Sequence, residues 1–284
     1  RFNLLNSIAI TGSNGKTTTK EMLASILRQK GKTLSNKGNF NNRIGVPLTV
    51  FNLTSDTEYA IFEIGTSEFG EIKVLTDITA PHCGIITNIG NSHLEFFKTP
   101  ENVLREKRTL IDGIDDDGFI ALNNDNPYLK SIIPQVTKKV ITFGLYNGAD
   151  VYAKNIKLWL DKPEFDMYID GKKETISLPI KGKFNIFNAL GAAAVAYGLG
   201  FSFEEIKEGL ATCTPPKMRM QTYTMNNGAV IINDAYNANP TSMQTSIKSL
   251  AQSYPGRDVI LVLGDMLELG EKTAQYHAEI GKYI

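Results

Sequence analysis

The chain has 284 residues, of which 42% are apolar and 21% are charged, so it has material for sizeable cores and for about two domains. Its 30 Lys and Arg residues balance its 30 Asp and Glu residues, which excludes a global basic field that would attract nucleic acid or an anionic membrane. Two cysteines exclude a disulfide framework, and no apolar run is long enough to span a bilayer, so we expect a cytoplasmic protein with buried free thiols.

The alternation of short apolar runs with amphipathic stretches predicts an α/β fold with a P-loop-type, mainly parallel sheet flanked by helices. We expect strands at 7–10, 59–64, 84–87, 119–122 and 140–143, and helices at 16–29, 70–75, 100–111 and 126–133. From residue 151 to 179 the apolar period changes to two, which indicates an antiparallel meander attached to this sheet. Helices at 185–199 and 203–211 follow.

A second unit begins after a proline-initiated break at 215–221. It has a strand at 230–233, a helix at 240–253, a strand at 259–263 and a helix from 271, an order that predicts a partial Rossmann-like α/β domain. We place the boundary near 221–227, with a first domain at 1–222 and a second at 223–284. Because the sequence starts almost directly on a strand and stops inside a helical pattern, we expect it to be a piece of a longer protein.

The segment TGSNGKTTT follows the first strand and opens the first helix. A turn containing Gly12 and Gly15 lets backbone N–H groups and the positive end of the helix face a phosphate. Lys16 adds a point charge, and the hydroxyl of Thr17 is in position to hold the Mg²⁺ that accompanies a nucleoside triphosphate. The alternative is a strand–turn–helix joint that carries this motif by chance.

Three other polar residues have both a functional and a structural interpretation. Glu63 ends an apolar strand at the carboxyl edge of the sheet, where α/β sites collect, although a strand-end carboxylate can also simply face water. His93 is a lone histidine, which is more often structural than a ligand. Lys107 stands in a charged helix turn, where a solvated helix face is the ordinary interpretation.

The loop TGSNGKTT resembles that of the Mur ligase family, ATP-dependent enzymes that add amino acids to the peptidoglycan precursor. Four further segments resemble the family member that adds D-alanyl-D-alanine: GNFNNRIGVPLT, ITNIGNSHLEFF, NDAYNANPTSM and GDMLELG. The resemblance covers essentially the whole chain. It implies that the family's N-terminal domain, which binds the uridine nucleotide, is absent and that the C-terminal domain is cut short.

The resemblance also implies a reaction, its cofactors and its partners. ATP would phosphorylate the terminal carboxylate of UDP-N-acetylmuramoyl-tripeptide, and the amine of D-alanyl-D-alanine would displace the phosphate to form an amide bond. The implied cofactors are ATP and two Mg²⁺ ions. We expect a monomer without a nucleic-acid or membrane partner.

The family's motifs assign roles to residues of this sequence. Catalytic roles are implied for Lys16, Lys107, His93 and Arg219. Nucleotide binding is implied for Gly12, Asn14, Gly15, Lys16, Thr17, Thr18, Asn185, Asn188, Arg219 and Asp234. Metal binding is implied for Thr17, Glu63, His93 and Lys107, the last as a lysine carbamylated by CO₂. Substrate binding is implied for Asn41, Asn42, Tyr236, Asn237 and Asn239.

Some of these residues also have plain structural interpretations. Asn185 is equally placed to cap its helix, and the Asn-rich stretch before Pro240 can be an ordinary helix start. If Arg219 and Asp234 serve ATP from opposite sides of the linker, closure of the two domains would assemble the site and exclude water.

Two other functions are compatible with part of the sequence. A folylpolyglutamate-type synthetase would explain the phosphate loop but not DAYNANP or GDMLELG. A P-loop module that hydrolyses or senses ATP would need Gly15, Lys16 and Thr17, but it would not need Glu63 and Lys107 together.

Overall fold

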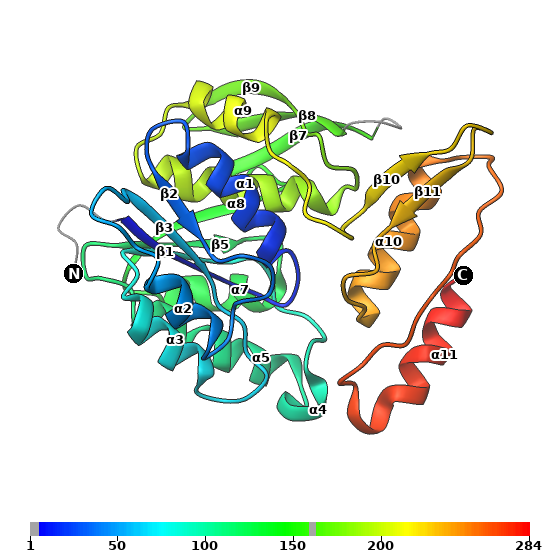
Figure 1. Cartoon of the computed structure of the whole chain (residues 1–284), viewed down its shortest axis with the longest axis horizontal. Helices are drawn as coiled ribbons and strands as arrows, with labels where there is room; N and C mark the ends of the chain where they lie inside the picture. The colour runs from blue at the N-terminus through cyan, green and yellow to red at the C-terminus, as the bar shows by residue number, and fades with distance from the viewer. Residues whose placement is uncertain (1–5, 159–162) are drawn as a thin grey trace.

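A nine-stranded sheet organises the chain up to β9 in the computed structural model, which describes residues 6–158 and 163–284 (Figure 1). The strands are β1 (Asn6–Thr11), β2 (Thr33–Ser35), β3 (Tyr59–Glu63), β4 (Cys83–Ile86), β5 (Phe119–Asn123), β6 (Lys139–Gly144), β7 (Val151–Leu158), β8 (Pro163–Ile169) and β9 (Lys172–Ser177). Their order is β2-β3-β1-β4-β5-β6-β7-β8-β9. The pairs from β2 to β7 are parallel, and β7, β8 and β9 pair antiparallel. The expected parallel sheet and meander are therefore confirmed.

Helices cover both faces of this sheet (Figure 1). One face carries α1 (Lys16–Leu27), α8 (Phe184–Gly198) and α9 (Phe203–Ala211). The other carries α2 (Gly45–Val50), α3 (Glu71–Thr79), α5 (Pro100–Lys107), α6 (Thr109–Asp112) and α7 (Pro127–Ile132). Along β1, Ile8 and Ile10 pack into the first core and Ala9 into the second, because successive strand side chains point to opposite faces.

The expected helices form with shifted ends. The helix expected at 70–75 extends to Thr79, and the one expected at 100–111 is divided at Arg108 into α5 and α6. Short elements such as β2, α2 and α4 (Leu94–Phe97) were not expected, because segments of three to six residues carry too few positions to display a period. Both cysteines are buried and free, as expected, and burial raises the pKa of each thiol.

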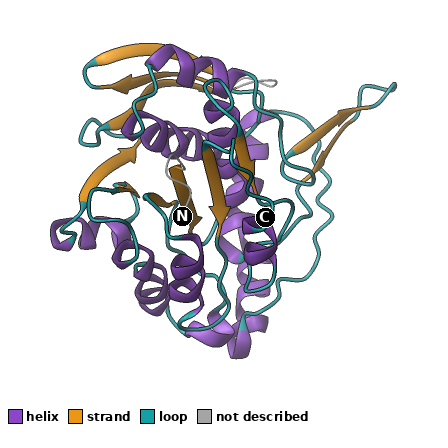
Figure 2. Ribbon diagram, turned by 60° about the vertical axis from the view of Figure 1, so that its left-hand side comes forward, coloured by secondary structure: helices purple, strands orange, loops and turns teal. Residues whose placement is uncertain are grey.

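The second unit contains β10 (Gln221–Thr224), β11 (Val230–Asn233), α10 (Pro240–Ser253), the short 3₁₀ helix η2 (Gly270–Lys272) and α11 (Thr273–Tyr283). The strand expected at 259–263 is wrong: this segment is irregular, and Ile260 and Val262 are 90% and 93% exposed. A strand needs a hydrogen-bonding neighbour, and β11 pairs antiparallel with β10 in a separate two-stranded sheet (Figure 2). The Rossmann-like pairing of 230–233 with 259–263 is thus not formed within the described residues.

Candidate active site

A cavity of about 750 Å³ lies where β1, β3, β4 and β5 end and α8 begins, facing the second unit. The carboxyl ends of parallel strands meet at one edge of a sheet, which is where α/β proteins bind ligands. The cavity brings together these expected site residues: Asn14, Gly15, Lys16, Thr17, Thr18, Asn41, Asn42, Glu63, His93, Asn185, Asn188, Arg219, Asp234, Tyr236, Asn237 and Asn239. Gly12 and Lys107 do not line it.

The loop between β1 and α1 has the geometry of a phosphate cradle. Gly15 has φ 83°, and a Cβ there would lie 2.2 Å from the Oδ1 atom of Asn188, so only glycine fits. The start of α1 has no side-chain cap and no acidic residue in its first turn, which leaves its first N–H groups for an anion. The ammonium of Lys16 donates to the carbonyl of Gly12 at 2.8 Å, which curls its side chain back over the loop.

Two residues that follow β4 hold this loop in place, and the sequence argument did not single them out. Asn88 Oδ1 accepts the backbone N–H of Asn14 at 3.0 Å, and Thr87 Oγ1 donates to the Asn14 carbonyl at 2.6 Å. The signal that was available is their position directly after a buried strand next to β1.

Glu63 presents one unpaired carboxylate oxygen beside this cradle. Its side chain is only 2% exposed, and Oε1 accepts a hydrogen bond from Asn41 Nδ2 at 2.9 Å. Oε2 is buried and has no hydrogen-bond partner among the described residues. Buried carboxylate oxygens are normally satisfied, so the orphaned atom indicates a site for a cation. The alternative of a strand-end carboxylate that faces water is wrong.

His93 lines the same cavity and contacts a carboxylate from the second unit. Its Nδ1 atom lies against Oε2 of Glu268 as an ion-pair contact without hydrogen-bond geometry. Burial lowers the pKa of His93, the charge on Glu268 raises it, and the charges on Lys107 and Lys16 lower it, so that the pKa falls below its usual value. His93 therefore lies within electrostatic range of both lysines.

Lys107 is buried rather than on a solvated helix face, so that interpretation is wrong. Its side chain on α5 is 1% exposed, and its ammonium makes no hydrogen bond or ion pair within residues 6–158 and 163–284. Burial, reinforced by the charge on Lys16, lowers the pKa of Lys107 well below its usual value, although Glu106 opposes this. The neutral amine is thereby favoured, and a neutral amine is nucleophilic.

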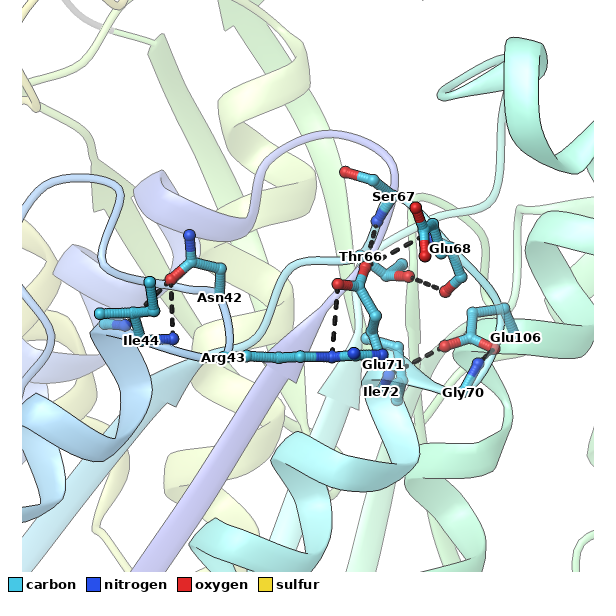
Figure 3. Close-up of polar contacts among 11 residues, drawn as sticks. Asn42, Arg43, Ile44, Thr66, Ser67, Glu68, Gly70, Glu71, Ile72 and Glu106 are labelled. Carbon is cyan, nitrogen blue, oxygen red and sulfur yellow. Dashed lines mark hydrogen bonds and ion pairs between the residues drawn. The ribbon is translucent and has the colours of Figure 1, made fainter.

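Two buried or half-buried glutamates hold the loop after β3, as Figure 3 shows. Glu106 accepts the backbone N–H groups of Gly70 and Ile72, each at 2.8 Å, at the start of α3. Glu71 accepts the N–H groups of Ser67 and Glu68 at 2.7 and 3.0 Å. Burial raises the pKa of Glu71, but these hydrogen bonds and the charge on Arg43 outweigh it and lower the pKa.

Asparagines fix the loop before α2. Asn36 forms a pair of 2.9 Å hydrogen bonds with the backbone of Glu63 and so sets the position of that residue. Asn42 Oδ1 accepts the N–H groups of Ile44 and Gly45 at 3.1 and 2.9 Å, which makes Asn42 a local turn former as well as a cavity residue.

The second unit contacts the phosphate loop directly. The Arg219 guanidinium donates to Thr17 Oγ1 at 3.2 Å and stacks 4.1 Å above the ring of Tyr236. Asn239 Nδ2 donates to Asn14 Oδ1 at 2.8 Å. Asn239 is also the N-cap of α10, which agrees with the structural interpretation of this segment.

The remaining nucleotide candidates are already hydrogen-bonded. Asp234 accepts the N–H of Met220 at 3.0 Å and the hydroxyl of Ser246 at 2.6 Å. The N-cap interpretation of Asn185 is wrong, because Asn185 lies inside α8, whose N-cap is Lys183. Asn185 Oδ1 instead accepts a 2.8 Å hydrogen bond from Asn188, the residue that lies against the phosphate loop.

Comparison with known families gives two matches along the chain. The family model described as Mur ligase middle domain matches residues 10–196, and the one described as Mur ligase, glutamate ligase domain matches residues 218–284. Among the described residues, the helices are too short or too polar to cross a bilayer.

Two relatives are named UDP-N-acetylmuramoyl-tripeptide–D-alanyl-D-alanine ligase. The protein from Bacillus subtilis is 38% identical over 278 residues, which cover 98% of this chain and 60% of the relative. The protein from Escherichia coli is 37% identical over 280 residues, which cover 97% of this chain and 61% of the relative. The chain thus spans about three fifths of the length of these relatives.

Solved structures agree with this similarity. MurF from Acinetobacter baumannii superposes with a TM-score of 0.94 at 34% identity, covering 99% of this chain and 61% of that protein. The MurF ligase from Thermotoga maritima, solved with ADP, gives a TM-score of 0.89 at 29% identity, covering 97% and 63%. A folylpolyglutamate synthetase from Lactobacillus casei, printed as L. casei FPGS, shares the fold at 16% identity with a TM-score of 0.71.

Proposed function

The chain belongs to the Mur ligase family, and from this premise we propose that it is part of an ATP-dependent ligase of peptidoglycan precursor synthesis. The ligase would join the terminal carboxylate of UDP-N-acetylmuramoyl-tripeptide to the amine of D-alanyl-D-alanine. Residues 1–222 would be the central ATP-binding domain, and 223–284 the first part of the C-terminal domain. We further propose that the longer protein acts in the cytoplasm as a monomer and carries a uridine-nucleotide-binding domain before this chain.

One observation carries the proposal. An uncapped helix N-terminus with Lys16 lies in the same cavity as the orphaned carboxylate oxygen of Glu63 and the ring of His93. A phosphate cradle beside a cation site suits the first step, in which two anions must approach each other. A module that only senses ATP has no need for this second set of ligands.

The nucleotide would be bound by both units. The N–H groups at the start of α1, with Lys16, would hold the β- and γ-phosphates. Arg219 reaches the hydroxyl of Thr17 and is in position to neutralise charge on the transferring phosphoryl group. Asn188 and Asp234 are the proposed contacts to adenine and ribose.

The residues present fit two Mg²⁺ ions. Thr17 would hold the ion that accompanies ATP, and Glu63, His93 and Lys107 would hold the second. Bound there, the ions would offset the repulsion between ATP and the substrate carboxylate. The amine of Lys107, kept neutral by burial, would add to CO₂ with loss of one proton and give a carbamate whose anionic oxygens suit Mg²⁺.

The substrates would enter from opposite sides of the cavity. Asn41 and Asn42 line the side that would receive the tripeptide carboxylate, and Tyr236, Asn237 and Asn239 line the side contributed by the second unit. The tripeptide carboxylate would take the γ-phosphoryl group and release ADP. The amine would then attack the acyl phosphate and release phosphate.

The test is ADP release by the full-length protein. We expect release that requires UDP-N-acetylmuramoyl-tripeptide, Mg²⁺ and D-alanyl-D-alanine together, and that fails when L-glutamate replaces the dipeptide. Lys16→Ala should abolish it, because the phosphate cradle loses its fixed cation. ADP release that ignores the dipeptide would contradict the proposal, and a preference for glutamate would favour a folylpolyglutamate-type enzyme.

A further inference from the structure

Glu268 is held at the cavity by a segment of the second unit that docks on α4. The flanking Met266 and Leu269 are 2% and 4% exposed. The carbonyl of Glu268 accepts the backbone N–H of Glu95 at 3.0 Å. Gly270 lies so close that a Cβ there would be 3.3 Å from the Cα of Glu95. The position of Glu268 is therefore built by tertiary contacts on both sides.

The backbone at this position is unusual. Glu268 has φ 60°, a left-handed conformation that costs free energy in a residue with a side chain. The docked segment maintains it, and the side chain lines the cavity with its carboxylate against His93. Strain kept at the wall of a binding cavity points to a use for that side chain.

Five carboxylates line the cavity, and their partners differ. Glu71, Asp125 and Asp234 each accept at least one backbone N–H group. Glu63 accepts the amide of Asn41 and is the proposed metal ligand. In the described part of the chain, the carboxylate of Glu268 accepts no hydrogen bond from backbone, amide or hydroxyl, and its contact is with His93. It is therefore the lining carboxylate with most capacity left for a ligand.

We propose that Glu268 binds the ammonium group of the incoming dipeptide, an inference that rests on the proposed function. The amine of a peptide has a pKa of about 8 and arrives largely as an ammonium ion with three N–H donors. Lys16 and Lys107 make the phosphate side of the cavity repulsive to a cation, whereas Glu268 attracts one from the second unit. Once the nitrogen has lost one proton, it still donates N–H to Glu268 while its lone pair faces the acyl phosphate.

The test compares Glu268→Gln with Glu271→Gln in the full-length enzyme. Glu271 is an exposed glutamate three residues further along the same segment, outside the cavity lining. We expect Glu268→Gln to raise the KM for D-alanyl-D-alanine about 10- to 100-fold, the usual worth of a hydrogen bond to a charged group. Glu271→Gln should stay at the wild-type value.

A charge-specific probe separates this role from a structural one. D-lactyl-D-alanine carries a hydroxyl in place of the ammonium, so as a competitive inhibitor it should bind more weakly than the dipeptide to the wild type and about equally to Glu268→Gln. Acyl-phosphate formation without dipeptide, followed by positional oxygen exchange in isotope-labelled ATP, should remain within about twofold of wild type, as should its Mg²⁺ requirement.

Three results would overturn the inference while the wild type remains an active ligase. These are an unchanged KM for the dipeptide, a parallel loss of positional exchange, and a raised Mg²⁺ requirement, which would make Glu268 part of the metal site. A wild type that releases no ADP in response to the dipeptide would instead contradict the proposed function itself.

Discussion

Lys107 is a buried ammonium-bearing residue without an anionic partner for its charge among the described residues. The pKa of Lys107 lies well below 10.5, so between that lowered value and 10.5 the unfolded chain binds more protons than the folded one. Stability therefore rises with pH across this range. In CO₂-free buffer at pH 7, Lys107→Met should raise the free energy of unfolding by about 1–3 kcal/mol and flatten this pH dependence. Urea denaturation between pH 6 and 9 measures both effects, and a destabilised variant would contradict them.

Gly15 offers a second test at the level of one residue. Gly15→Ala places a Cβ 2.2 Å from Asn188 Oδ1, whereas Gly38→Ala has nothing within 4 Å, although both glycines have positive φ. Each variant should lose about 1 kcal/mol of stability to the left-handed backbone. Calorimetric titration should find weaker Mg²⁺-ATP binding only in Gly15→Ala, because only that loop must move. Equal affinities in the two variants would count against the cradle.

Single residues were predicted from sequence where a motif fixes their position along the backbone. Lys16 and Thr17 follow a strand and open a helix, so their place at the cavity follows from chain order alone. The burial of Lys107 was not predictable from its charged neighbours, because it depends on α5 packing against α3. Thr87 and Asn88 were missed because their contacts with Asn14 join segments more than 70 residues apart.

At the level of elements, the junction between α5 and α3 depends on Glu106. Its carboxylate satisfies two N–H groups at the start of α3 and lies 2% exposed next to Lys107. Glu106→Gln removes the charge that suits a helix N-terminus and should cost about 1–3 kcal/mol. Glu101→Gln, an exposed change in the first turn of the same helix, should cost less than about 0.5 kcal/mol. Equal unfolding free energies in urea would contradict this role.

The elements also show where sequence patterns stop being sufficient. Periodicity located α1, α8, α9 and the meander because each buries one clear face. The segment at 259–263 has the apolar composition of a strand, but a strand exists only when a neighbour pairs with it. β11 pairs with β10 instead, and that pairing is a property of the tertiary structure.

For the whole molecule, the contact between the two units is the feature to test. Asn239→Ser retains a good N-cap for α10 but removes the amide that donates to Asn14. We expect unchanged helix content and a larger radius of gyration in small-angle scattering, because the second unit loses a contact to the phosphate loop. Asn14→Ala should give the same change, and the double variant should add nothing further. Additive expansion would show that the two side chains do not act through each other.

The most direct measurement is calorimetric titration of the folded chain with Mg²⁺-ATP. We predict saturable binding at one site that requires Mg²⁺, is lost in Lys16→Ala and is weakened in Glu63→Gln. Absence of binding, or equal affinity in wild type and Lys16→Ala, would contradict the assignment of this cavity to a nucleoside triphosphate.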